Sequence, residues 1–100
     1  MDSCILALLA PPELRDNLTD WLLAFHEALT FTSQQIDHYG AHPGTMSAGE
    51  QVTGSQRKLL VRVRTPREAA EEILAGLRVD FPQAGLEYWI TPLEGMGRIG

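Results

Sequence analysis

The sequence feature that most constrains the fold is an uninterrupted apolar run close to the N-terminus, Cys4–Ala10. A strand with one face in water alternates apolar and polar residues, whereas this run offers no polar residue to either face. It therefore predicts a central strand that helices cover on one face and that something equally apolar covers on the other. We expect other copies of the chain to provide that second cover, because each apolar side chain left in water would forfeit roughly 1.5–3 kcal/mol.

Length and charge limit the class of protein. The 100 residues, 44% of them hydrophobic, are material for one compact domain that spans 1–100. The formal net charge of -5 argues against binding to nucleic acid. The apolar run is too short to cross a bilayer and lacks the basic flank of a signal peptide, so we expect a cytoplasmic protein that is not embedded in a membrane. Cys4 is the only cysteine, and its place in the run predicts a buried, inert thiol.

The rest of the sequence alternates between helix-like and strand-like patterns. Two segments have apolar residues at helical spacing and a proline at their start, and three show the composition and alternation of strands. A long polar loop punctuated by glycines separates the second strand from the third. In chain order, the predicted elements are a strand (Cys4–Ala10), a helix (Pro12–Leu29), an edge strand (Phe31–Tyr39), the loop (Gly40–Ser55), a strand (Arg57–Arg64), a helix from Pro66 and a strand (Leu86–Leu93).

Capping patterns locate two helix starts. Thr65, Pro66 and Glu68 combine an N-cap threonine, a first-turn proline and a capping-box glutamate, which predicts that the second helix begins at Pro66. Ser47 and Glu50 have the same spacing and predict one short turn of helix inside the loop. The resulting order, β-α-β-β-α-β, is typical of the α+β ferredoxin-like sandwich, in which both helices cover one face of an antiparallel sheet.

The C-terminal run Leu86–Ile99 resembles the last strand and tail of PII-type signalling proteins. More closely, Trp89–Glu94 with Gly97-Arg98, and Glu50–Gly54 followed by the basic Gln56–Lys58, look like a small PII-like family, domain of unknown function 3240. The resemblance implies a PII-like homotrimer whose ligand clefts lie between neighbouring subunits. It also implies an association with heavy-metal efflux, and hence a membrane metal-efflux protein as a partner.

Two segments depart from the pattern of the PII proteins that bind ATP. The stretch Val79–Leu86, before the last strand, offers neither a lysine nor a glycine-rich phosphate cradle. The tail ends in Arg98-Ile99-Gly100, so it carries one of the two arginines found in those proteins. The sequence therefore does not predict a triphosphate site, and it leaves a smaller anion open.

Arginines of the third strand are the candidates for an anion site. Arg62 and Arg64 share one face of that strand, and Arg98 could reach a cleft between subunits from the tail. Guanidinium groups suit phosphate or carboxylate because they bind both in a bidentate manner. The alternative is ion pairing within or between chains, with partners among Glu68, Glu71, Glu72 and Glu94.

A carboxylate and two imidazoles near the start of the loop, from Asp37, His38 and His42, are candidate ligands for zinc, copper or nickel. The two histidines would face the same way only in a helix, which Gly40 and Pro43 oppose. Ligands from adjacent chains could complete such a site. The alternative is that these are ordinary solvated histidines of a surface loop.

The functional prediction is a PII-like, trimeric regulatory protein without catalysis, which senses or relays a small ligand through the loop Gly40–Ser55. Ligand in the cleft would order the loop, and the ordered loop would present or withhold a docking surface. Trp89 alternates with Tyr88 and Ile90 and is expected to anchor the subunit interface from the opposite face. The alternative is a metal-binding module that buffers or delivers divalent cations through the loop histidines. An enzyme is not predicted, because the sequence shows no nucleophile–base pair.

Overall fold

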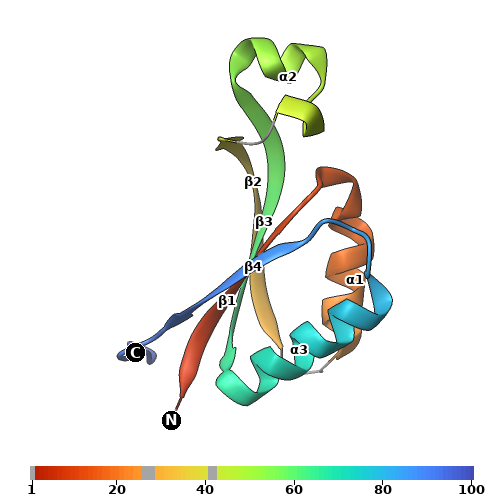
Figure 1. Cartoon of the computed structure of the whole chain (residues 1–100). Coiled ribbons are helices and arrows are strands. Elements are labelled where there is room, and N and C mark those ends of the chain that lie inside the picture. The colour runs from red at the N-terminus through yellow and green to blue at the C-terminus, as the bar shows by residue number, and fades with distance from the viewer. Residues whose placement is uncertain (1, 26–28, 41–42) are drawn as a thin grey trace.

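A computed structural model describes residues 2–25, 29–40 and 43–100. Four strands form one antiparallel sheet in the order β2-β3-β1-β4. Two helices, α1 and α3, cover one face of it, and no helix of the described residues lies on the other face (Figure 1). The predicted ferredoxin-like order is therefore confirmed. The elements are β1 (Ser3–Ala10), α1 (Arg15–Phe25), β2 (Thr30–Tyr39), α2 (Ala48–Thr53), β3 (Ser55–Pro66), α3 (Arg67–Asp80) and β4 (Glu87–Pro92).

The main core lies between the helices and the sheet. Alternate residues of β1 and β3 point to this layer, and the apolar stripes of the two helices pack on them. The side chains at its centre are almost completely buried, and they come from β1 (Leu6, Leu8), α1 (Leu18, Leu22), β3 (Leu59, Val61, Val63) and α3 (Ile73, Leu77). The helical spacing noted in the sequence thus identified the face that each helix buries.

The opposite face of the sheet, which we call the open face, is partly covered by the chain itself. Ala7, Leu9 and Leu60 are buried there, with Ile36 of β2 packed against them. The expectation that other copies must cover the whole second face of the N-terminal run is therefore wrong for Ala7 and Leu9. β1 lies inside the sheet between β3 and β4, so Ala7 is flanked by Arg62 and Trp89, and Leu9 is flanked by Leu60 and Glu87.

The β2–β3 hairpin projects beyond the rest of the molecule and carries α2 near its end (Figure 1). The two strands pair continuously from Thr30 with Arg64 to Tyr39 with Ser55. The short helix predicted from the capping pattern is confirmed, since Ser47 and Glu50 exchange both hydrogen bonds of a capping box. The tip therefore has a defined local structure in the part of the loop that the structure describes.

Two helices begin at residues other than the predicted ones. Thr65 and Pro66 continue the pairing of β3 with β1, so α3 begins at Arg67 with Pro66 as its N-cap residue. Thr65 is buried in the sheet, and the Arg67 N–H donates to the Asp2 carbonyl at 2.7 Å. Strand pairing has overridden the N-cap role predicted for Thr65. At the other helix, a single 3-10 turn, Pro12–Leu14, precedes α1.

Among the described residues, no helix combines the length and the apolar character that a bilayer-spanning segment requires.

Candidate anion site on the open face

Strand alternation places Arg62 and Arg64 of β3 together on the open face. Arg62 lies between Ala7 of β1 and Thr32 of β2, and Arg64 lies between Ile5 and Thr30 in the same way. The two arginines border a hollow of about 290 Å³. Its lining residues come from β1 (Ile5), β2 (Thr30, Phe31, Thr32) and β3 (Arg62, Arg64).

The two guanidinium groups have no carboxylate partner in the part of the chain that is described. Arg62 donates from Nη1 to Gln34 Oε1 at 2.6 Å, which fixes one edge of its guanidinium group. Arg64 is exposed and makes no hydrogen bond or ion pair to the described residues. In the described residues, neither arginine forms an ion pair with the glutamates considered as alternative partners, which are Glu68, Glu71, Glu72 and Glu94. Two like charges are thus held on neighbouring positions of one face.

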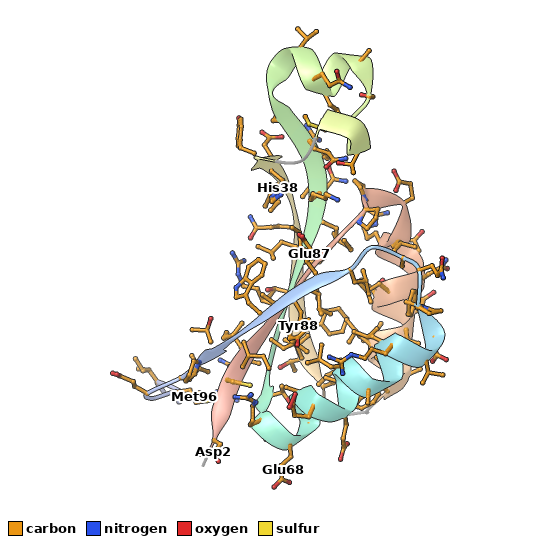
Figure 2. The ribbon with its side chains drawn as sticks, viewed as in Figure 1. Asp2, His38, Glu68, Glu87, Tyr88 and Met96 are labelled. Carbon is orange, nitrogen blue, oxygen red and sulfur yellow. The ribbon has the colours of Figure 1, made fainter. Side chains whose placement is uncertain are left out.

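Arg98, the third residue of the predicted anion site, does not line this hollow. It belongs to the tail after β4, whose start is held by a hydrogen bond from the Leu93 N–H to the Ser3 carbonyl at 3.0 Å. Figure 2 shows Met96 of this tail at the opposite end of the sheet from His38. Within one chain, the structure brings together two of the three predicted arginines.

The predicted metal ligands are dispersed in the described residues. Asp37 and His38 are neighbours on β2 and therefore point to opposite faces of that strand. Asp37 Oδ1 lies 3.8 Å from Arg57 Nε, an ion pair on the exposed hairpin. His42 lies outside the described residues. Across residues 2–25, 29–40 and 43–100, no three His, Cys, Asp or Glu side chains come close enough to hold an ion.

Trp89 lies on the open face beside Ala7, and 47% of its surface is exposed. Tyr88 and Ile90, its neighbours in β4, pair with Leu8 and Leu6 and point to the helix-covered face. The role of Trp89 as an interface anchor stays a prediction. Its position on the open face and its partial exposure are compatible with that role.

Cys4 is buried in β1, as its sequence context predicts. Its thiol donates to the Thr65 carbonyl at 3.4 Å. Burial raises the pKa of the Cys4 thiol above its ordinary value, and the neighbouring Glu71 acts in the same direction while Arg67 opposes it. A thiol that stays protonated is a poor nucleophile, so Cys4 has a packing role.

A second hollow, which the sequence did not predict, lies between α3 and β4. Arg78 and Tyr88 both line it, with the Arg78 guanidinium carbon 5.9 Å from the centre of the Tyr88 ring. Arg78 follows Leu74 by one helical turn, so the pattern does place it next to the apolar stripe. Its proximity to Tyr88 could not be foreseen, because it depends on how α3 packs on the sheet.

The sheet order and the long hairpin define a PII-like ferredoxin fold, and comparison with solved structures agrees. The chain is similar to CPII, a nitrogen regulatory PII-like protein from Thiomonas intermedia, with a TM-score of 0.70 and 15% identity. The match covers 99% of this chain and 98% of that one. The CPII structure is described as bound to ADP, AMP and bicarbonate.

The chain belongs to the family described as protein of unknown function (DUF3240), which it matches over residues 1–100. A DUF3240 family protein from Shewanella baltica has the same fold, with a TM-score of 0.77 and 19% identity. That match covers 100% of this chain and 99% of the other. No curated protein matches the sequence.

Proposed function

We propose that this protein is a non-catalytic, ligand-sensing regulator that binds a small anion at the Arg62–Arg64 hollow. The observation that carries the proposal is the pair of guanidinium groups on the open face without a carboxylate partner among the described residues. In a chain of net charge -5, two adjacent positive charges without such partners form a local attraction for anions. The PII-like fold supports the regulatory part of the proposal.

We expect a small oxyanion rather than a triphosphate, because the stretch Val79–Leu86 offers neither a lysine nor a glycine-rich phosphate cradle. The bicarbonate named for CPII is one such anion. AMP, which is also named for CPII, carries a single phosphate on a nucleoside and is a second candidate ligand. Planar guanidinium groups bind carbonate-like and phosphate oxygens in pairs. Threonines at the rim, Thr30 and Thr32, offer hydroxyl donors to the same anion.

The proposed active state is a homotrimer in the cytoplasm, with the open faces of neighbouring copies turned toward one another. Ile5, Ile36 and Trp89 would contribute apolar contact area, because none of them is fully buried in the single chain. In such an arrangement Arg98 of a neighbouring copy could supply the third guanidinium group. A membrane metal-efflux complex, the partner implied by the family resemblance, stays part of this hypothesis.

The β2–β3 hairpin is the proposed output of the site. Arg62 and Arg64 belong to the same continuous strand, β3, that runs outward to α2. An anion that fixes these two side chains would also fix the twist of β3 and thereby the orientation of the hairpin tip. Because the tip already contains α2, we expect ligand to change how the tip is presented rather than to create its fold.

Calorimetric titration with bicarbonate, inorganic phosphate and AMP tests the proposal. We expect at least one of them to bind, and the double variant Arg62→Gln with Arg64→Gln to lower its affinity more than about tenfold, since a charge-assisted hydrogen bond contributes about 1.5–3 kcal/mol. Arg15→Gln is the matched control. Arg15 is an exposed arginine that pairs with Asp16, and it belongs to α1, which covers the opposite face of the sheet. Equal affinities for the double variant and the control would contradict the proposal.

A further inference from the structure

The hollow between α3 and β4 has the dimensions of a small-molecule site. Its volume is about 330 Å³, at the lower end of the roughly 300–1,000 Å³ that ligand pockets occupy. Its floor is formed by Leu8 of β1 and by Leu74 and Leu77 of α3, all almost completely buried. An apolar group bound there would contact the buried side chains of Leu8, Leu74 and Leu77.

The rim of this hollow is polar on one side. Arg78 and Tyr88 are both exposed, and the guanidinium group lies over the ring in a cation–π arrangement. Among the described residues, no acceptor takes a hydrogen bond from Arg78 and no carboxylate pairs with it. Asp80, two residues further along α3, accepts a hydrogen bond from Trp21 Nε1 at 2.6 Å. The donors of Arg78 are therefore available to a ligand.

We propose that this hollow binds a small monocarboxylate with an apolar body. The body lies on the leucine floor, and the carboxylate accepts two hydrogen bonds from Arg78, whose orientation the Tyr88 ring restricts. An inorganic anion would gain nothing from the floor, and a neutral apolar molecule would leave the guanidinium group without an acceptor. Straight-chain and single-ring acids share the required chemistry.

The proposed site is independent of the anion site on the open face. Leu8 and Tyr88 face the helices, whereas Arg62 and Arg64 face the other way. A variant in one hollow therefore does not alter the lining of the other. Failure of either proposal can be recognised separately.

Titration of the nitrogen-15-labelled chain with octanoate, phenylpropionate and octanol tests the site. Octanol has the same number of carbons as octanoate and carries a neutral hydroxyl in place of the carboxylate. We expect both carboxylates to shift the amides of Leu74, Leu77 and Tyr88, and octanoate to bind about tenfold more tightly than octanol, because the charged hydrogen bonds to Arg78 are missing in the alcohol. The relative affinities of octanoate and phenylpropionate distinguish a straight-chain ligand from an aromatic one.

Variants separate the charge of the rim from the volume of the hollow. Arg78→Gln should weaken octanoate about tenfold and leave octanol unchanged, while Arg78→Lys should fall between because it keeps the charge and loses the bidentate geometry. Leu86 is a half-buried residue that lines the hollow. Leu86→Trp should narrow the hollow and therefore lower the affinity for both octanoate and octanol. Arg15→Gln, at an exposed arginine of α1 that lines neither hollow, is the matched control and should weaken neither ligand.

Three results would overturn the proposal. One is equal binding of octanoate and octanol, and another is an octanoate affinity that Arg78→Gln leaves unchanged. The third is amide shifts confined to the open face or the absence of any shift. Because Arg78 is exposed, loss of folding in its variants is not expected, and their melting temperatures serve as the check.

Discussion

The two faces of the sheet each carry a hollow with arginine at its edge, yet the hollows differ in what surrounds the charge. On the open face, two arginines stand beside two threonines of β2 and Ile5 of β1. On the helix-covered face, one arginine stands over a floor of buried leucines. The two proposals made above follow from this difference: the same guanidinium chemistry would bind a small inorganic anion on the open face and an amphipathic acid on the helix-covered face. If both are correct, the residues beneath the charge, rather than the charge itself, determine the class of ligand.

The difference in packing between the faces should appear as a difference in stability, and this is the largest effect we expect. Leu8→Ala removes a fully buried side chain between the sheet and the helices and should lower the free energy of unfolding by about 2–5 kcal/mol. Leu9→Ala, the neighbouring change on the open face, should cost less, because fewer buried residues surround Leu9. Urea denaturation of both variants measures the two values. A cost for Leu9→Ala equal to or above that for Leu8→Ala would show that the faces are packed alike in solution.

The open face should depend on Trp89 for self-association. Trp89→Ala should weaken the proposed trimer by more than about tenfold, since interface anchors of this type contribute about 2 kcal/mol or more. Sedimentation across a concentration series measures the shift from trimer to single chains of 11.1 kDa. Tyr88→Ala is the control, because the neighbouring Tyr88 points to the other face and is similarly exposed. Equal weakening by both variants would remove Trp89 from its proposed role.

The helix layer should also be sensitive to added volume. A Cβ at Gly76 of α3 would lie 2.7 Å from the ring of Trp21, so Gly76→Ala should lower the stability by about 1–3 kcal/mol despite the better helix propensity of alanine. Gly49 of α2 has open space around it, and Gly49→Ala should leave the stability unchanged or raise it by up to about 1 kcal/mol. Thermal unfolding of the two variants compares them directly. A melting temperature that rises for both would mean that Trp21 moves away without cost.

The smallest effect is expected from substitution of His38 and His42. If the protein regulates through anions, substitution of His38 and His42 by alanine should leave zinc, copper and nickel binding unchanged, since Asp37 and His38 point to opposite faces of β2. Metal titration by calorimetry is the measurement, and the unaltered chain is the reference. A clear loss of metal affinity in the double variant would favour the metal-binding alternative.

Much of the architecture followed from local patterns in the sequence. The apolar run of β1, the stripes of α1 and α3 and the capping box of Ser47 and Glu50 each act over a few residues, so their periods and spacings are visible without the fold. Thr65 shows where this ends. Its capping pattern was genuine, but pairing of β3 with β1, more than sixty positions away in the chain, extended the strand through it.

The sites were predictable to the extent that one strand defines them. Alternation placed Arg62 and Arg64 on one face because both belong to β3. The same rule places Asp37 and His38 on opposite faces of β2, although they are adjacent in the sequence. Arg78 and Tyr88 come from a helix and a strand whose distance depends on tertiary packing, and no local pattern could have joined them.

The capping box at the hairpin tip has a consequence for any partner that docks there. Ser47 and Glu50 hold the first turn of α2 by hydrogen bonds internal to the chain. A docking partner would meet a preorganised surface, so little backbone entropy would be lost at the tip on association. If the proposed regulation by a ligand is correct, such a contact needs only a small area, so it could be made and broken each time the ligand is gained or lost.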